Sequence, residues 1–382
     1  MKKRIILIIC FLLCLFPLSV HAEESDLTPN ASGAILIESS SGEVIYEKNA
    51  DEQLYPASMT KMMGLILIFE ALNEGRLDLK DSVTVSENAA SMGGSQIFLE
   101  VNEVMSVEDL VKSICIASAN DAMVAMAEKL SGSVINFVQQ MNDKAELLGL
   151  KNTHFTNTTG LHDEQHYSSA RDMALIAKKL IEVGGEQLLA ITSTYDTYIR
   201  EASEQPFWLV NTNKLIKQIP GVDGLKTGFT QEAKSCITVT ALRDGLRLIA
   251  VVMKEPSSQV RNKEVTQLIE YGFSIYEQTL LMEEGDVVDV YRNEFSDIKE
   301  ADLILLQPVQ LVHRKGEEIS IVNQQLSLFS IALPIEQYQQ VGELIIELSN
   351  GNQLRLPVGV GLKMENCSFL ELMMKIFKGM LF

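Results

Sequence analysis

Two stretches of the chain alternate apolar and polar residues, which is the pattern of strands that bury one face of a sheet. Residues 33–49 read GAILIESSSGEVIYEKN and alternate around a Ser/Gly turn. Residues 235–253 read SCITVTALRDGLRLIAVVM and turn at Arg243-Asp244-Gly245. Each stretch therefore predicts a β-hairpin.

Helical spacing of apolar residues fills most of the chain between these hairpins. It is found at 58–73, 107–117, 120–131, 133–148 and 169–183, and again after the second hairpin at 258–277. Strands at both ends with helices between them predict one antiparallel sheet, closed by the two halves of the segment, with helices on both faces. We expect this α+β domain to span residues 23–280.

The pattern changes again from about Glu283. Short alternating segments follow one another, separated by Gly, Asn and charged residues, among them DVVDVYR, LILLQPVQLVH, ELIIELS and QLRLPVGV. Such segments are typical of a small all-β domain, which we place at 283–361.

The N-terminal segment has the layout of a secretory signal peptide. Residues 1–22 read MKKRIILIICFLLCLFPLSVHA, with a basic start, an apolar run and a small residue, Ala22, at a plausible cleavage point. The mature chain would start at Glu23, outside the cytoplasm. The alternatives are an uncleaved anchor, against which the short run broken by Pro17 argues, and lipidation at Cys14, against which the bulky preceding residues argue.

The C-terminal segment, 365–382, predicts an amphipathic helix. In SFLELMMKIFKGMLF the charged residues Glu371, Lys375 and Lys378 lie on one helical stripe and nearly all others are apolar. Fifteen helical residues extend about 22 Å, too short to cross a bilayer core of about 30 Å but suited to lying in its interface. The alternative is a terminal helix docked on the protein's own core.

Composition narrows the class of protein. With 382 residues, 46% of them hydrophobic and 22% charged, the chain can bury the cores of two domains. The net charge is −19, or −22 once the three basic residues of the predicted signal are removed, which argues against a nucleic-acid partner. The three cysteines outside the signal, Cys115, Cys236 and Cys367, are odd in number and imply no disulfide framework.

One predicted helix carries candidate chemistry at its start. Residues 55–72 read YPASMTKMMGLILIFEAL, so Ser58 and Lys61 stand three residues apart on one face of an otherwise apolar helix. Burial favours the neutral amine, which can act as a base. Backbone N–H groups at a helix start can stabilise an oxyanion. The pattern indicates an activated serine nucleophile.

SxxK alone is weak evidence, because a chain of this length contains about one or two by chance. A second copy, Ser296 to Lys299, lacks the apolar helix, so we expect a solvated loop there. Further elements are needed to support the first copy.

Two other motifs supply such elements. Ser118-Ala119-Asn120 lies between two apolar helical runs, whereas the similar Ser86-Glu87-Asn88 lies in a polar stretch that favours a solvated turn. Lys226-Thr227-Gly228, in VDGLKTGFT, stands just before the second hairpin. Glycine there lets a substrate approach a strand edge, while lysine and threonine can hold a carboxylate.

The order SxxK, SxN, KTG resembles that of the penicillin-interacting serine acyl-transferases. More closely, the chain resembles the low-molecular-mass D-alanyl-D-alanine carboxypeptidases, peptidase family S11, over about residues 25–280. The supporting stretches are YPASMTKMM, SMGGSQIFL, SANDAMVAMAE, LGLKNTHFTNTTGLHDEQHYSSARDMALIA and VDGLKTGFT. The β domain and the amphipathic C-terminal helix also resemble those of the family's membrane-tethered members.

This resemblance implies a reaction in which Ser58, activated by Lys61, attacks the D-Ala-D-Ala end of a peptidoglycan stem peptide and releases D-alanine. Ser118 would relay a proton and Asn120 would orient Lys61 and the substrate. β-Lactam antibiotics would be covalent inhibitors. No metal or organic cofactor is implied.

The substrate-binding residues follow from the same resemblance. Lys226 and Thr227 would bind the terminal carboxylate beside Gly228, and the backbone N–H of Phe229 would complete the oxyanion site with that of Ser58. Arg261 is a candidate second carboxylate partner, with a surface arginine as the alternative.

Three rival functions stay open. His154, His162 and His166 suggest a zinc hydrolase, because the last two, in HDEQH, have the spacing of a zinc ligand pair, although Gly160 and the polar run predict a loop. A β-lactamase of the same fold would need a deacylation base that the sequence does not reveal. A catalytically silent peptidoglycan-binding protein is at odds with three intact motifs.

Overall fold

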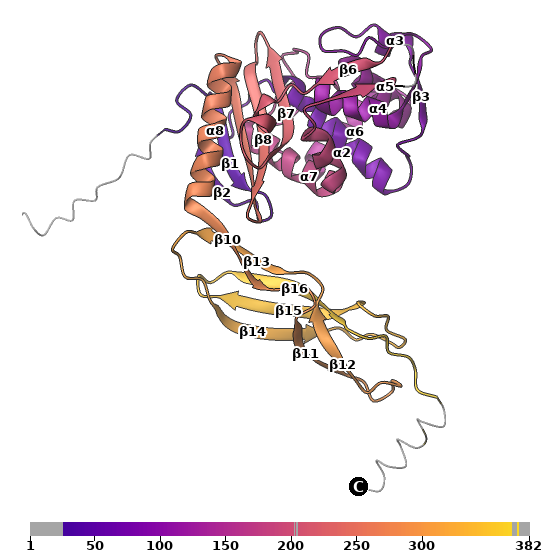
Figure 1. Ribbon diagram of the computed structural model, residues 1–382, viewed down its shortest axis with the longest axis vertical. Helices are drawn as coiled ribbons and strands as arrows, with labels where there is room; N and C mark the ends of the chain where they lie inside the picture. Colours follow the sequence, from indigo (N-terminus) through magenta and orange to yellow (C-terminus); the bar gives the residue numbers. More distant parts are fainter. Residues whose placement is uncertain (1–25, 202, 204, 369–372, 374–382) are drawn as a thin grey trace, which may run out of the picture.

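The computed structural model describes residues 26–201, 203, 205–368 and 373. The described chain forms two bodies, an upper one of helices and strands and a lower one of strands alone (Figure 1). The predicted signal peptide, residues 1–22, and the charged stripe of Glu371, Lys375 and Lys378 lie outside the described residues.

A five-stranded antiparallel sheet forms the centre of the upper body. Its order is β2-β1-β9-β8-β7, and the strands are β1 (Gly33–Glu38), β2 (Val44–Lys48), β7 (Val222–Thr230), β8 (Lys234–Arg243) and β9 (Leu246–Glu255). The N-terminal hairpin joins the later one through β1 and β9, from Gly33 opposite Met253 to Glu38 opposite Leu248. The predicted sheet closed by both halves of the segment is thereby confirmed.

Turn chemistry explains the second hairpin. Asp244 and Gly245 connect β8 and β9 with φ of 47° and 84°. Two consecutive residues with positive φ define the tight turn whose twist matches that of paired strands, and an Asp-Gly pair adopts it readily.

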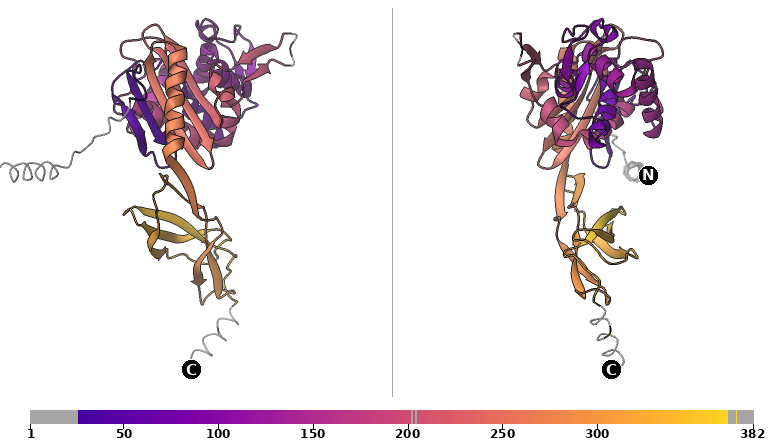
Figure 2. Two further views of the ribbon diagram at one scale, coloured as in Figure 1. Left: turned by 60° about the vertical axis from the view of Figure 1, so that its left-hand side comes forward. Right: turned by 90° about the vertical axis from the view of Figure 1, so that its right-hand side faces the viewer.

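Helices cover both faces of the sheet. Helix α8 (Ser258–Ile275) covers one face, in front of the strands in the left view of Figure 2, and the short η3 (Lys214–Lys217) packs into the same core as α8. The remaining helical elements lie on the other side: η1 (Ala57–Thr60), α2 (Lys61–Asn73), α3 (Glu87–Ala90), α4 (Val107–Lys112), the π-helical turn η2 (Ser113–Ala117), α5 (Asn120–Ser131), α6 (Val134–Leu147) and α7 (Ala170–Thr192). Each side has its own apolar core, so the predicted fold class is correct.

Serine is the N-cap residue of many of these helices, and its hydroxyl caps the first turn. Each hydroxyl accepts a hydrogen bond from the backbone N–H three residues ahead, which satisfies one of the unpaired donors of the first turn. The capping serines are Ser86, Ser106, Ser133, Ser169 and Ser257. Helix α7 extends past the predicted end at 183, although its backbone leaves helical geometry at Gly185.

In the upper body, the sequence pattern did not reveal three sets of strands. They are β7 itself and the hairpins β3 (Ser82–Thr84) with β4 (Val104–Ser106) and β5 (Asp196–Ile199) with β6 (Phe207–Val210). The glycines and polar residues of β7 give it no apolar pattern from which a strand could be predicted. The strand is nevertheless buried, because it packs against η1 and the helices beside it. Strands three or four residues long are too short for a clear alternation.

The lower body has a separate core and only strands. Its main sheet has the order β11-β12-β16-β15-β14, formed by β11 (Val287–Arg292), β12 (Glu300–Leu305), β14 (Ile321–Leu328), β15 (Gln340–Leu348) and β16 (Gln353–Val360). A two-stranded sheet of β10 (Tyr276–Met282) and β13 (Val309–Arg314) stands beside the junction with α8. The all-β character predicted after Glu283 is correct, and its first strand already begins at Tyr276.

The segment after this sheet is extended at its start. Met364 is fully buried and bridges Ile335, and Asn366 bridges Ser296. Residues 365–368 are therefore not helical, and the rest of the helix predicted at 365–382 lies outside the described residues, apart from Met373.

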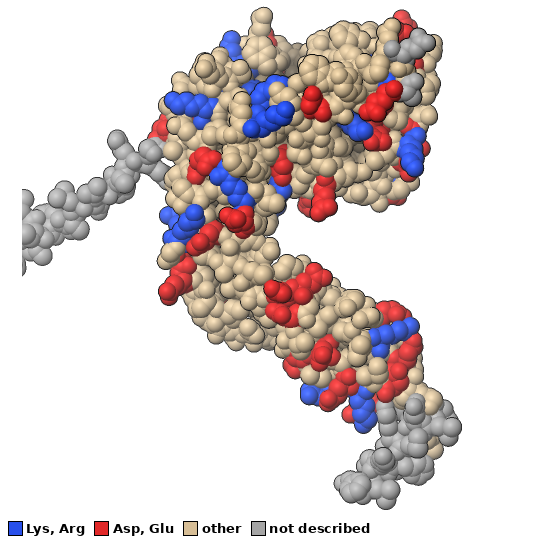
Figure 3. Space-filling view, viewed as in Figure 1, with Lys and Arg blue, Asp and Glu red and all other residues tan. Residues whose placement is uncertain are grey.

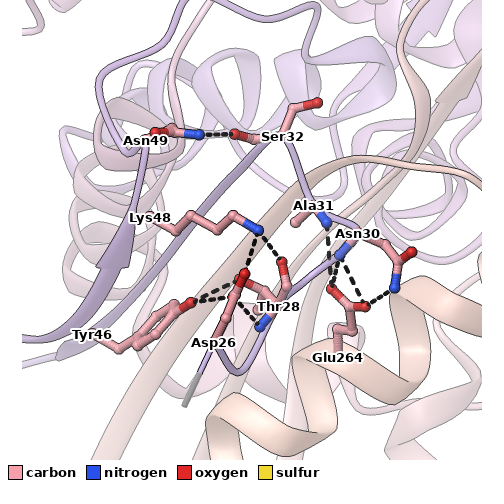
Figure 4. Close-up of polar contacts among 9 residues, drawn as sticks. All are labelled: Asp26, Thr28, Asn30, Ala31, Ser32, Tyr46, Lys48, Asn49 and Glu264. Atoms are coloured by element: carbon pink, nitrogen blue, oxygen red, sulfur yellow. Dashed lines mark hydrogen bonds and ion pairs between the residues drawn. The ribbon is translucent and has the colours of Figure 1, made fainter. Parts of the chain in front are cut away.

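The first described residues are held against the upper body (Figure 4). The backbone N–H groups of Asn30 and Ala31 donate to the carboxylate of Glu264 on α8. Lys48 on β2 donates to the carboxylate of Asp26 and to the carbonyl of Thr28. The segment leading into β1 is thus fixed to both β2 and α8.

The surface carries charges of both signs. On the face shown in Figure 3, acidic and basic side chains are interspersed over both bodies. Among the described helices, none has the length and apolar character needed to cross a membrane.

Candidate active site

Ser58 and Lys61 meet where a tight helical turn becomes a buried helix. Ser58 lies in η1 and Lys61 is the first residue of α2. The side-chain atoms Ser58 Oγ and Lys61 Nζ are 3.0 Å apart, within hydrogen-bond distance. The predicted pairing of hydroxyl and amine is present in the structure.

Burial alters the chemistry of Lys61. Its side chain is fully buried, because α2 is apolar on every side and its residues from Lys61 to Phe69 are all buried. Loss of hydration lowers the pKa of Lys61 well below its ordinary value, and the charge of Lys226 lowers it further. Asp121 acts in the opposite direction. The neutral amine is favoured, as a general base requires.

A carbonyl group from a distant loop fixes the orientation of this amine. Lys61 Nζ donates to the carbonyl oxygen of Thr159 over 2.9 Å. The next residue, Gly160, has a φ of +82° and lies directly on η1, so that a Cβ there would stand 1.8 Å from the carbonyl oxygen of Ala57. Only glycine permits this close approach of the loop to the nucleophile.

Ser118 occupies the break between two helices that the sequence predicted. It follows the π-helical turn η2 and has a φ of 63°, a left-handed conformation uncommon for serine. This geometry ends η2 and lets α5 begin two residues later. Ser118 Oγ accepts a hydrogen bond of 2.8 Å from Nζ of Lys226.

Asn120 is held by the loop before β4. Its backbone N–H donates to the carbonyl of Ser95, and its Nδ2 donates to the carbonyl of Gly93. The remaining acceptor, Oδ1, is buried and has no partner among the described residues. Such an atom can receive a hydrogen bond from a substrate amide.

The Lys226-Thr227-Gly228 motif lies on β7, at the edge of the central sheet. Lys226 is fully buried, which lowers its pKa to about 7, with Cys115 opposing and Arg261 adding to the shift. Thr227 Oγ1 donates to Oγ1 of Thr212 over 2.8 Å. The amine of Lys226 thus contacts Ser118, and the hydroxyl of Thr227 contacts Thr212.

Gly228 brings the strand edge against the nucleophile. A Cβ at this position would stand 2.7 Å from the carbonyl of Pro56 and 3.3 Å from the backbone N of Ser58. The next residue, Phe229, exposes 67% of its surface at the end of the motif. Gly228 is therefore the position at which β7 contacts the turn of Ser58, and the backbone of Phe229 comes directly after this contact.

Arg261 lies behind this strand. It is 7% exposed, and its guanidinium contacts the Asn262 side chain and the Cys236 carbonyl, the latter at 3.4 Å. Cys236 stands opposite Gly228 in the β7–β8 register. The alternative that Arg261 is a surface arginine is therefore wrong. Its side chain extends from α8 to the part of the sheet where Gly228 lies.

The other candidate motifs lie apart from this site. Ser86 caps α3 instead of entering a site. Ser296 is fully buried and bonded to Asp297 and the Glu365 carbonyl, so the expected solvated position was wrong for the serine. Lys299 is exposed and pairs with Glu294.

The two histidines of HDEQH point to different partners. His162 is exposed and meets the Tyr55 ring edge-on, with 4.7 Å between centroids. His166 is buried and bonds to Thr60. Across the described residues, no group of three metal-binding side chains was found.

Sequence reasoning missed three contributors to the site: Thr159, Gly160 and Thr212. Thr159 acts through its backbone carbonyl, which no side-chain pattern reports. The turn signal in NTTG could have marked Gly160. Thr212 comes close to Thr227 only through the fold.

Comparison with known proteins agrees with the family resemblance that the three motifs indicated. A family model described as D-alanyl-D-alanine carboxypeptidase, Peptidase_S11, matches residues 19–257. The D-alanyl-D-alanine carboxypeptidase DacF of Bacillus subtilis is 43% identical over 376 residues, covering 96% of this chain and 96% of that protein.

Solved structures show the same likeness in three dimensions. Penicillin-binding protein 5 from Haemophilus influenzae matches with a TM-score of 0.67 and 32% identity, over 88% of this chain and 98% of that one. A peptidoglycan synthesis regulatory factor (PBP3) from Streptococcus pneumoniae matches with a TM-score of 0.73 and 26% identity, over 88% and 99%. These matches extend beyond the first body of the chain.

Proposed function

Because this chain belongs to peptidase family S11, the D-alanyl-D-alanine carboxypeptidases, we propose that Ser58 is the nucleophile that releases D-alanine from peptidoglycan stem peptides. The observation that carries the proposal is the 3.0 Å separation between Ser58 Oγ and the fully buried Nζ of Lys61. The enzyme is a serine hydrolase, and the reaction proceeds through an acyl-enzyme.

Acylation begins with proton transfer. Neutral Lys61 takes the hydroxyl proton of Ser58 while Oγ attacks the carbonyl carbon of the penultimate D-alanine. The negative charge that develops on the carbonyl oxygen is bound by the backbone N–H groups of Ser58 and Phe229. Gly228 supports this assignment, because it lets β7 approach the backbone of Ser58 closely.

The residues around β7 and the start of α5 bind the substrate carboxylate and protonate the leaving group. Lys226 and Thr227 bind the terminal carboxylate, and Arg261 adds positive charge from behind the strand. Ser118 passes its hydroxyl proton to the departing amine of D-alanine and takes a proton from Nζ of Lys226, which donates a hydrogen bond to it. The unpartnered Oδ1 of Asn120 accepts the N–H of the substrate backbone. Water then hydrolyses the acyl-enzyme.

Penicillin resembles the acyl donor, so it should acylate the same serine. The experiment is mass spectrometry of the purified protein after brief exposure to penicillin, followed by peptide mapping. A covalent adduct on Ser58, together with D-alanine release from a D-Ala-D-Ala peptide, supports the proposal. An adduct on another residue refutes it, and rapid loss of the adduct without D-alanine release identifies a β-lactamase instead.

The location of the enzyme follows from its substrate. Peptidoglycan lies outside the cytoplasmic membrane, and residues 1–22 have the composition of a signal peptide that would deliver the chain there. The apolar face of the C-terminal segment, with Glu371, Lys375 and Lys378 on its polar stripe, supports a peripheral tether to the membrane surface.

A further inference from the structure

His166 is a buried imidazole in a loop, and the proposed reaction does not use it. The loop joins α6 to α7, yet the side chain of His166 is only 2% exposed. Its Nε2 lies 2.7 Å from Oγ1 of Thr60, and its Nδ1 lies 3.1 Å from the backbone N of Thr156. The ring also packs against Phe155, at 5.6 Å between centroids.

These partners determine which nitrogen carries the proton. The backbone N–H of Thr156 can only donate, so Nδ1 must accept. The proton therefore resides on Nε2, which donates to the hydroxyl of Thr60. Burial lowers the pKa of His166 to about 4, with the charge of Asp163 opposing the shift and that of His154 adding to it. The neutral ring is the form that satisfies both contacts.

The two contacts join the nucleophile turn to the loop that orients the base. Thr60 stands between Ser58 and Lys61 in the chain and is fully buried. Thr156 begins the turn in which Asn157 Oδ1 accepts the N–H groups of Thr159 and Gly160. The carbonyl of Thr159 at the end of this turn accepts the hydrogen bond from Lys61.

We propose that His166 is a positioning residue for Lys61: its ring, held between Thr60 and Thr156, keeps the Thr159 carbonyl at the place where it directs the Lys61 amine toward Ser58. This role rests on the proposed function, in which Lys61 is the base. The ring lies outside the groups assigned to substrate binding. Its loss should therefore slow acylation and leave substrate affinity nearly unchanged.

The test compares variants of the full-length protein by penicillin acylation rate, by kcat and KM on a D-Ala-D-Ala peptide, and by the pH dependence of acylation. His166→Phe keeps an aromatic ring but removes both polar contacts. We expect its acylation rate and kcat to fall about 10- to 100-fold, because small misplacements of catalytic groups have effects of this size. KM should change less than about threefold, and the pH at which acylation reaches half its maximum should shift.

Two further variants and a control separate positioning from folding. His166→Gln offers an acceptor and a donor and should recover much of the rate. Thr60→Val removes only the hydroxyl and should slow acylation in the same way, which keeps the test valid if His166→Phe does not fold. His313→Phe, the same change on β13 of the other body, should leave acylation unchanged.

A specific pattern of results would overturn the proposal. If His166→Phe or Thr60→Val acylates at the normal rate with the normal pH profile, His166 contributes only to stability. The same holds if His166→Gln is no faster than His166→Phe. A wild-type protein that penicillin does not label would refute the proposed function itself, so the two failures are distinguishable.

Discussion

Nζ of Lys226 lies 2.8 Å from Oγ of Ser118, a residue 108 positions earlier in the chain. The contact joins the edge strand of the sheet to the break between two helices of the helical layer. It gives Ser118 a proton donor on the side where the substrate carboxylate should bind. The pKa of Lys226, lowered to about 7 by burial, makes this side of the site sensitive to pH.

The first prediction is a bell-shaped dependence of kcat/KM on pH. Activity should rise as Lys61 loses its proton and fall above about pH 7, where Lys226 loses the charge that holds the carboxylate. In Lys226→Arg the guanidinium stays charged, so the descending limb should disappear even if the overall rate is lower. Persistence of that limb in the variant would assign it to another group.

The second prediction concerns the two SxxK serines. Ser58→Ala should abolish both penicillin labelling and D-alanine release. Ser296→Ala is the matched control, because it removes a buried hydroxyl in the other body; it should cost about 1 kcal/mol of stability and leave both activities intact. The measurements are adduct mass and D-alanine release, and labelling that survives Ser58→Ala would exclude Ser58 as the nucleophile.

The third prediction concerns the form of Lys61. Arginine keeps the positive charge and cannot give up its proton at ordinary pH, so Lys61→Arg should acylate about 10²- to 10⁴-fold more slowly. Circular dichroism checks that the variant is folded. Acylation at a near-normal rate by a folded Lys61→Arg would mean that the proton leaves Ser58 by another route, such as Ser118.

The fourth prediction compares two glycines with positive φ. In Gly160→Ala the new Cβ would overlap the carbonyl of Ala57, so we expect a loss of roughly 2–5 kcal/mol in unfolding free energy, together with loss of acylation. Gly149 has a φ of +70° but open space around its Cβ position, so Gly149→Ala should cost only about 1 kcal/mol and keep activity. Equal effects in denaturant titrations of both variants would contradict this account.

The fifth prediction concerns the membrane tether, and the structure determines where to cut. Met364 is part of the β-domain core, so a chain ending near Leu362 would lose a buried residue. A chain ending at Ser368 retains that core. It should hydrolyse small peptides normally but fail to sediment with anionic lipid vesicles that bind the full-length protein. Equal vesicle binding by both chains would refute the tether.

Several features of the fold were determined by local sequence alone. The hairpins at 33–49 and 235–253 follow from alternation and turn residues, and the helices follow from apolar spacing and capping serines. Ser58 and Lys61 could be paired from sequence because residues three positions apart on a helix lie on the same face, and this holds without any contact to the rest of the chain.

Other features depend on contacts between distant segments, and only the tertiary structure decided them. Thr159 reaches Lys61 across 98 positions through a backbone carbonyl, and Lys226 reaches Ser118 across 108. Ser296 shows the reverse case, since a polar local sequence suggested solvent while a bridge to Asn366 buries it. Local pattern reports how a segment folds by itself, whereas burial, pKa and the partner of a polar atom depend on which remote segment packs against it.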